Sequence, residues 1–123
     1  MRIVGGKHRS RIINAPEGLN TRPSLDKTRE AIFNIIAYYV YDANVLDIFS
    51  GSGAIGIEAL SRGAKYAAFV ENNKDALDCI KSNLSFTKLE NQSEIYPIHA
   101  LDALRALELG GKVFDVVFMD PPY

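Results

Sequence analysis

The stretch Asp47-Ile48-Phe49-Ser50-Gly51-Ser52-Gly53-Ala54-Ile55-Gly56 joins a short apolar run to a segment with a helical pattern. It contains Gly-x-Gly-x-x-Gly, and between a strand and a helix such glycines permit a tight turn and close approach of a ligand to the backbone. An acid about 20 residues further on can hydrogen-bond a ribose, and Glu71 stands twenty positions after Gly51. The stretch therefore predicts the cofactor-binding turn of a Rossmann-like α/β domain.

Asp47 separates two classes of ligand for this turn. An acid just ahead of the glycines is unfavourable near a pyrophosphate, because like charges repel at short range in a partly dry site. It suits a cationic ligand instead. A nicotinamide-dependent oxidoreductase stays open as an alternative, because the glycines alone do not exclude it.

From Asn44 onward, strands alternate with helices, which is the pattern of a parallel sheet with helical crossovers. The predicted strands are 45–48, 66–70, 95–98 and 113–119, and the predicted helices are 53–62, 74–86 and 102–109. Right-handed crossovers bring the carboxyl ends of the strands to one edge, where α/β sheets bind ligands. Asp47 to Gly53, Glu71, Asp102 and residues 120–123 are expected at that edge.

The N-terminal residues predict a hairpin and a linker over 1–23, ahead of the Rossmann-like domain over 24–123. Residues 2–4 and 9–13 flank a glycine-containing turn. His8 is expected at or near the tip of this turn, solvated and with no role beyond a contact with RNA. Ser24 is expected to cap a helix running to about Tyr39. The face that we expect to pack on the sheet comprises Leu25, Ile32, Ile35, Ile36 and Tyr39.

Charge is unevenly distributed along the chain. Residues 1–30 have seven basic and three acidic side chains, a net charge of +4, whereas residues 31–123 have seven and twelve, a net charge of -5. A basic segment on an acidic body is typical of an arm that contacts a polyanion, because phosphate contacts by Lys and Arg dominate nucleic-acid affinity. A solvated hairpin with ordinary surface charge is the alternative.

Length and composition, 123 residues of which 47% are hydrophobic, fit one compact domain. The apolar runs are far shorter than the roughly 20 residues of a membrane-spanning helix, and Met1 does not begin a signal-peptide pattern. The single cysteine, Cys79, cannot form an internal disulfide, which fits a reducing, cytoplasmic setting.

The last four residues, Asp120-Pro121-Pro122-Tyr123, follow the apolar run 113–119. Proline has no N–H and fixes its own φ, so the chain must leave the sheet there. A turn stiffened in this way can aim a carboxylate and a carbonyl at one amino group, while the aromatic ring stacks on a planar base. A strand that simply ends at a Pro-Pro turn is the plainer interpretation.

The run Asp47-x-Phe49-x-Gly51-Ser52-Gly53-x-x-Gly56, with Glu71, Asp102 and Asp-Pro-Pro-Tyr after successive strands, resembles the class I S-adenosylmethionine-dependent amino-methyltransferases. The opening blocks 2–7, 21–23 and 28–34 are similar to the RsmD family, bacterial enzymes that methylate the N2 amino group of one guanine in 16S ribosomal RNA. The similarity covers essentially the whole chain. It implies a Rossmann-like sheet whose first four parallel strands have the order 3-2-1-4.

The resemblance also implies roles for individual residues. The residues expected to bind S-adenosylmethionine are Asp47, Phe49, Gly51, Ser52, Gly53, Glu71, Asn72 and Asp102, with Asp47 near the methionine ammonium, Glu71 on the ribose and Asp102 on the adenine amino group. Asp102 as a helix N-cap and Asn72 as a turn residue are the alternatives from local sequence. The expected catalytic residues are Asp120, Pro121, Pro122 and Tyr123. The residues expected to contact RNA, in 16S rRNA or the small ribosomal subunit, are Arg2, Lys7, Arg9, Arg11 and Arg22.

Neither a metal nor a general-base histidine is expected, because the proton can leave to water after methyl transfer. Enzymes of this class have seven-stranded sheets, so the fourth strand is expected to be an open edge, available for pairing with another chain. We therefore expect weak or absent activity from these 123 residues alone. An adenine-N6 methyltransferase and a non-catalytic RNA-binding module remain alternatives.

Overall fold

The computed structural model describes residues 1–15 and 23–121. Four strands, β1 (Asn44–Ile48), β2 (Tyr66–Val70), β3 (Ser93–Tyr96) and β4 (Val116–Met119), form one parallel sheet in the order β3-β2-β1-β4. The helices are α1 (Pro23–Val40), α2 (Ala54–Ser61), α3 (Lys74–Thr87) and α4 (Ala100–Leu109), with a short 3-10 turn, η1 (Glu90–Gln92). This confirms the predicted Rossmann-like sheet and strand order, with β4 as an edge of the described sheet.

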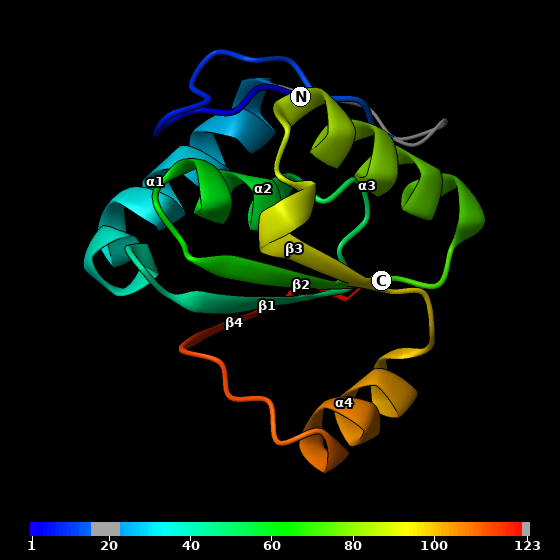
Figure 1. Ribbon diagram of the computed structural model, residues 1–123. Coiled ribbons are helices and arrows are strands. Elements are labelled where there is room, and N and C mark those ends of the chain that lie inside the picture. The colour runs from blue at the N-terminus through cyan, green and yellow to red at the C-terminus, as the bar shows by residue number, and fades with distance from the viewer. Residues whose placement is uncertain (16–22, 122–123) are drawn as a thin grey trace.

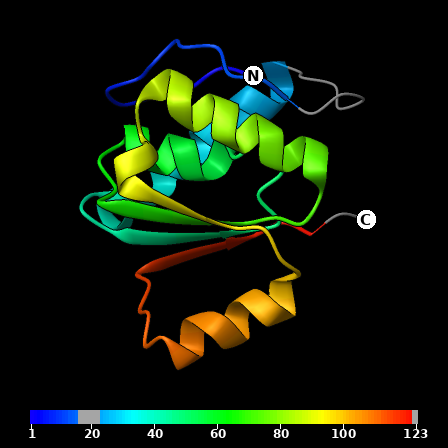
Figure 2. The same cartoon turned by 45° about the vertical axis from the view of Figure 1, so that its right-hand side comes forward.

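Helices cover both faces of the sheet. Figures 1 and 2 show α1, α2 and α3 on one face and α4 on the other. Successive side chains of a strand point to opposite faces, and both faces of β1 and β2 are buried after the first residue of each strand. Val45 and Phe69 belong to the core beneath α1 to α3, whereas Leu46 and Val70 pack with Ala103 of α4.

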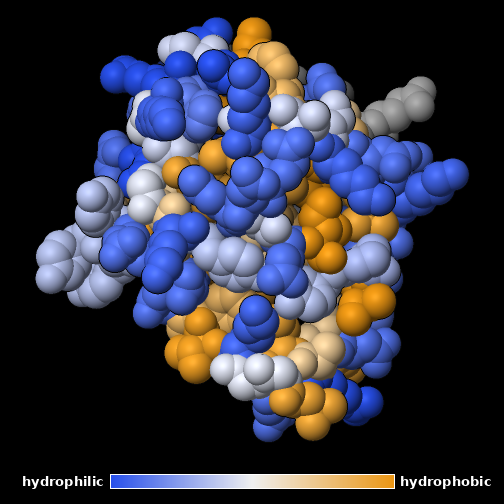
Figure 3. Space-filling model, viewed as in Figure 1, coloured by the Kyte–Doolittle hydropathy of each residue, from blue (hydrophilic) through white to orange (hydrophobic). Residues whose placement is uncertain are grey.

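The coverage by α4 is thin. Only Ala103 and Leu107 of this helix are buried, and Leu101, Leu104 and Leu109 are exposed. Figure 3 shows hydrophobic residues gathered over the lower part of the molecule, around α4 and the adjacent face of the sheet. After α4, Phe114 stacks against Tyr66 with ring centroids 6.5 Å apart, which ties the chain back to the sheet before β4 begins.

The element boundaries differ from the prediction in places where a local interaction decides them. β3 ends at Tyr96 rather than at Ile98, because Pro97 has no N–H for the ladder. α4 begins at Ala100 rather than at Asp102, because the His99 side chain caps it by accepting from the Leu101 N–H. β4 starts at Val116 rather than at Val113, because pairing with β1 begins at Val116, opposite Val45. α1 begins at Pro23, a residue favoured at the first helical position, so Ser24 is not its cap.

The predicted buried face of α1 is wrong for four of its five residues. The structure buries Arg29, Phe33 and Val40, with Ile36 partly buried, whereas the predicted residues Leu25, Ile32, Ile35 and Tyr39 are exposed. The stripe that faces the core includes an arginine, which sequence periodicity assigns to solvent. The burial of Arg29 is explained by the acids that it meets.

Glu58, in the middle of α2, is fully buried and holds three partners. Its carboxylate accepts from the Val4 N–H at 3.0 Å, and it pairs with Arg29 Nε at 3.3 Å and Arg62 Nε at 2.8 Å. Arg29 also pairs with Asp26 and donates to the Arg2 carbonyl. One carboxylate thus connects the N-terminal segment, α1 and α2.

The N-terminal residues 1–15 form a hairpin-shaped arm over the helices, as Figure 1 shows in blue. Pairing is limited to an antiparallel bridge between Arg2 and Ile12 and a few backbone hydrogen bonds such as Ile3 N to Arg11 O at 2.9 Å. Ile3 and Ile13 are buried in the same core as the α1 to α3 face of the sheet. Within the described ranges, no helix is long and apolar enough to cross a membrane.

Replacing Glu58 with Gln should destabilise the fold by about 3 kcal/mol, because it leaves two largely buried guanidinium groups without their shared carboxylate. Urea unfolding measures the change. Glu94→Gln is the matched control, since the Glu94–Lys112 pair is 3.7 Å apart and half exposed, and it should change stability by less than about 1 kcal/mol. Equal effects of the two substitutions would contradict the role given to Glu58.

Candidate functional site

Three acids lie at the carboxyl edge of the sheet. Ile48 pairs with Val70 on one side and with Met119 on the other, so Glu71 and Asp120 each follow the last paired residue of their strands. Asp47 lies one residue before the end of β1. The strand register therefore brings together the acids that the sequence predicted at this edge.

The glycine-containing turn after β1 is held by its own backbone. Phe49, Gly51 and Gly53 have φ values of 64°, 56° and 82°, in the left-handed region. Ser50 fixes the turn, because its N–H donates to Val70 O at 3.0 Å and its hydroxyl donates to Asp47 O at 2.6 Å. A side chain built at Gly51 would meet no atom within 4 Å, so the loop backbone faces open space where a ligand can approach.

The third glycine of the motif has a different function. A Cβ at Gly56 would lie 2.3 Å from the ring of Phe69 on β2, so this glycine allows α2 to pack closely on the sheet. Its N–H also donates to the Asp47 carboxylate at 3.1 Å. The motif thus combines a ligand-facing turn with a helix-to-sheet contact.

Glu71 joins the loops that follow β1 and β2. One carboxylate oxygen accepts from the Gly51 N–H at 2.8 Å, and the other accepts from the Asn72 and Asn73 N–H groups at 3.1 and 3.0 Å. The carboxylate is only partly buried, so it remains open to a ligand hydroxyl. These bonds fix the position of the carboxylate at the carboxyl edge of the sheet.

Asp47 is buried and is held in an electrostatically unfavourable position. Burial is the main cause that raises the pKa of its carboxyl to about 7; the nearby acids Glu71 and Asp120 contribute to the rise, and the hydrogen bond from the Gly56 N–H opposes it. No cationic side chain in the described part of the chain offsets this rise in pKa. A ligand with an ammonium group would supply the missing positive charge.

The other residues predicted to bind the cofactor differ in exposure and in the hydrogen bonds of their side chains. Phe49 and Asn72 are exposed at the carboxyl edge. Ser52 is buried, with its hydroxyl on the Met1 sulfur at 3.2 Å and its carbonyl accepting from Asn83, so its side chain is already engaged. Asp102 is exposed within the first turn of α4, and His99 rather than Asp102 caps that helix.

The predicted base site is only partly described. Asp120 is exposed and Pro121 is half-buried directly after β4, while Pro122 and Tyr123 lie outside the described residues. The acid and the Pro121 carbonyl thus leave the sheet beside the glycine turn. The described part has no group of three or more His, Cys, Asp or Glu residues that could hold a metal ion.

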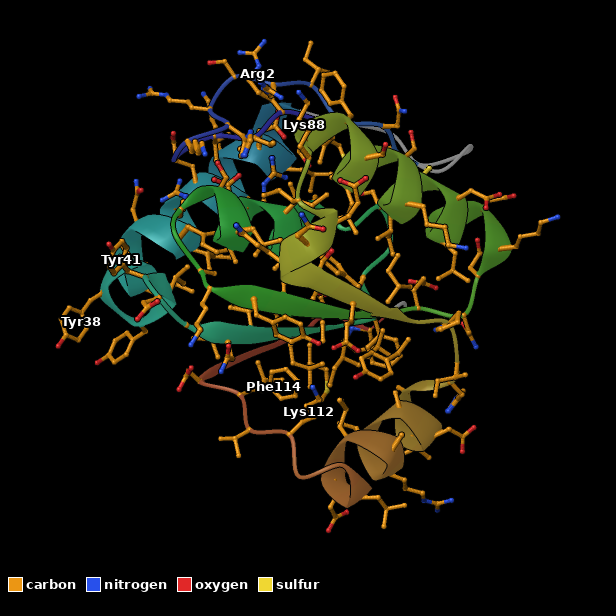
Figure 4. All side chains as sticks on the ribbon, viewed as in Figure 1. Arg2, Tyr38, Tyr41, Lys88, Lys112 and Phe114 are labelled. Carbon is orange, nitrogen blue, oxygen red and sulfur yellow. The ribbon has the colours of Figure 1, made fainter. Side chains whose placement is uncertain are left out.

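The basic residues of the arm lie along the α2 and α3 side of the molecule. Arg2, Lys7, Arg9 and Arg11 are exposed, and the Arg11 guanidinium lies 5.8 Å from the centroid of the Phe86 ring; Figure 4 shows Arg2 on the arm. Arg22 lies outside the described residues. The expectation that His8 is solvated is wrong, because the residue is buried and its backbone N–H donates to Ser61 Oγ at 2.9 Å.

The sequence interpretation missed Asn83, a buried residue of α3 that holds the arm against the glycine turn. Its side chain accepts from the Asn14 N–H and donates to the carbonyls of Asn14 and Ser52. A polar residue on the apolar face of a predicted helix was the available signal. Glu58, within the apolar run of α2, gave a similar signal.

Replacing Asp47 with Asn should stabilise the ligand-free protein at pH 8 by roughly 2 to 4 kcal/mol. The pKa of the Asp47 carboxyl is higher in the folded than in the unfolded protein, so the folded protein keeps its proton to a higher pH. The free energy of unfolding of the wild type therefore falls as pH rises from about 4 to about 7. Urea unfolding of both proteins at pH 5 and pH 8 measures this difference. A difference that does not grow with pH would contradict the buried charge at Asp47.

Comparisons with known proteins agree with this geometry. The sequence is 41% identical over 123 residues to the Bacillus subtilis protein YlbH, of which it covers 67%, and 37% identical to the Escherichia coli ribosomal RNA small subunit methyltransferase D, of which it covers 60%. A hypothetical protein of Thermus thermophilus has a solved structure that superposes with a TM-score of 0.86 at 33% identity. That match covers 100% of this chain and 70% of the other.

The chain thus spans about three fifths of the length of the Escherichia coli relative. The sequence model of one family, described as Conserved hypothetical protein 95, matches residues 1–123, the whole chain. The match includes the arm, the glycine turn and the Asp-Pro-Pro-Tyr sequence. The chain belongs to the Conserved hypothetical protein 95 family.

Proposed function

We propose that this chain is the cofactor-binding part of an S-adenosylmethionine-dependent methyltransferase that modifies the N2 amino group of a guanine in 16S rRNA. The observation that supports it most is the carboxyl edge, where the buried Asp47 and the loop-bridging Glu71 flank an open glycine turn beside Asp120. The name of the Escherichia coli relative supports ribosomal RNA of the small subunit as the substrate. A cytoplasmic location and no need for a metal follow from this reaction.

The residues present fit such a cofactor. Asp47 offers a buried carboxylate to the methionine ammonium, and Glu71 offers a fixed carboxylate to the ribose hydroxyls. Gly51, beside open space, lets the ligand approach the backbone. Asn72 and Asp102 are proposed for the adenosine. When bound, the cofactor supplies a methyl group on a sulfonium, which a nitrogen nucleophile can accept directly.

The chain's own residues would act on the amino group. The exocyclic amine of guanine is a poor nucleophile because its lone pair is delocalised into the ring. Asp120 and the Pro121 carbonyl would accept its two N–H bonds, favour a pyramidal nitrogen and stabilise the positive charge that develops there. The bound cofactor would supply the methyl group and keep the electron pair of the broken S–C bond on its sulfur, and the amine proton would leave to water.

The proposal for Pro122 and Tyr123 rests on sequence alone. A proline pair would stiffen the turn, and the Tyr123 ring would stack on the target base and hold it in line with the methyl group. The basic residues of the arm and Arg22 would hold the RNA backbone while the base is turned out of its stack. The open edge of β4 would then pair with further strands or with another chain.

Substrate choice decides between this proposal and an adenine-N6 methyltransferase, since an Asp-Pro-Pro-Tyr site recognises an amino group on either base. The experiment uses a chain extended to the length of the relatives, labelled S-adenosylmethionine, and either small-subunit rRNA or duplex DNA. Mass spectrometry of the digested RNA should locate the label on N2 of a guanine. Label on adenine, or transfer to DNA alone, would contradict the proposal.

Asp120→Ala should lower kcat by about 100-fold to 1000-fold in the extended chain, since it removes a group that stabilises charge only during transfer. Affinity for S-adenosylhomocysteine, measured by calorimetry, should stay unchanged. Asp120→Asn keeps an acceptor oxygen and should retain part of the rate. Glu108→Ala, an exposed acid on α4, is the control, and an equal loss in that variant would remove the special role of Asp120.

A further inference from the structure

An open cavity of about 530 Å³ lies where the arm meets the ends of α2 and α3. The lining residues that matter for its chemistry are Lys7, His8, Arg11, Tyr41, Ser61 and Lys88. Several of the lining residues lie within three positions before a strand: Tyr41 before β1, Gly63 and Ala64 before β2, and Gln92 before β3. The cavity is therefore at the amino edge of the sheet, opposite the edge with Asp47 and Glu71.

The walls are built by close backbone contacts. The Lys7 N–H donates to Ser61 O at 2.8 Å, and the Ser61 hydroxyl donates to Gly5 O at 2.7 Å. Gly6 has φ 77°, and a Cβ there would lie 1.9 Å from Ser61 O, so only glycine fits this contact. The tip of the arm is thus fixed against the C-terminal end of α2.

The charge of the wall is entirely positive. Lys7, Arg11 and Lys88 line the cavity, and none of its described lining residues is Asp or Glu. The acids Asp42 and Glu90 are sequence neighbours of lining residues but are not part of the wall. Three cations converge here from two separate segments, the arm and the end of α3.

His8 adds a second, independent feature. It is 9% exposed, it lines the cavity, and its Nδ1 is buried with no hydrogen-bond partner among the residues that the structure describes. Burial, with Arg11 and Lys7 nearby, holds the pKa of this imidazole below its ordinary value of 6.5. The wall of this basic cavity therefore contains an imidazole nitrogen, His8 Nδ1, that has no hydrogen-bond partner among the described residues.

Because Lys7, Arg11 and Lys88 line one cavity together with the unpartnered His8, we propose that the cavity binds a phosphate group at the amino edge of the sheet. The source of the phosphate that we favour is the backbone of the RNA, a choice that rests on the proposed function. Figure 4 labels two lining residues, Tyr41 beyond α1 and Lys88 beyond α3. The exposed Tyr41 ring, packed beside Gly63, gives the cavity an aromatic wall.

The position of the site sets a length for the RNA. β2 has five residues, which at about 3.3 Å per residue separates the two edges of the sheet by about 17 Å. A stacked strand rises about 3.4 Å per nucleotide, so about five nucleotides cover that distance. A single strand that joins a target base at Asp120 to a phosphate at Lys88 therefore needs at least about five nucleotides.

The same cations can be explained by the partial negative charge at the C-terminal ends of α2 and α3. That explanation requires no ligand, so binding measurements distinguish it from a phosphate site. NMR spectra follow the ring signals of His8 while inorganic phosphate or a single-stranded RNA of eight nucleotides is added to the chain. His99, which caps α4 at the opposite edge, is the internal reference.

We expect both probes to shift the His8 signals, with little change at His99 on adding phosphate. Lys88→Gln should weaken RNA binding by about tenfold at 0.1 M salt and lower the salt slope by about 1. Lys81→Gln, which removes the same charge from an exposed position on α3, should have a much smaller effect. Urea unfolding verifies that both variants are folded.

The proposed phosphate site is contradicted if the His8 ring signals do not shift with either probe. It is also contradicted if Lys88→Gln and Lys81→Gln weaken RNA binding equally. If RNA binds no more tightly than inorganic phosphate, the phosphate site stands and its assignment to an RNA backbone fails. Methyl transfer tests the proposed function separately. Loss of transfer with intact phosphate binding would contradict that function and leave the site in place.

Discussion

The carboxylate of Glu71 makes the interaction on which the candidate cofactor site depends. By accepting from the N–H groups of Gly51, Asn72 and Asn73, it fixes the loop after β1 to the loop after β2. The parallel register makes this possible, because Ile48 and Val70 are paired at the ends of neighbouring strands. With the loops joined in this way, the glycine turn faces open space in a fixed conformation, and the buried Asp47 lies just beneath it.

The arm is connected to the same framework at three points. Glu58 accepts from the Val4 N–H before the tip of the arm, Asn83 bonds to Asn14 after it, and Ser61 fixes the tip itself. Asn83 also contacts the carbonyl of Ser52 in the glycine turn. The basic arm is therefore held rigidly across α2 and α3, and it extends from the cofactor edge to the opposite edge of the sheet.

Much of this arrangement could be predicted from the sequence, because it follows from local rules. Alternating strands and helices determine the parallel sheet, and the sheet places Asp47, Glu71 and Asp120 at one edge. The buried face of α1 could not be predicted, since burial of Arg29 depends on Glu58, which is distant in sequence. The burial of His8 is also a tertiary effect, because it requires the arm to pack on the end of α2.

Calorimetric titration of this chain can establish whether the carboxyl edge binds an adenosyl cofactor with a cationic amino group. The ligands are S-adenosylhomocysteine and NAD, and Glu71→Ala and Asp47→Asn are the matched variants. We expect saturable binding of S-adenosylhomocysteine that both substitutions weaken strongly, with negligible binding of NAD. Binding of NAD without binding of S-adenosylhomocysteine would contradict this expectation.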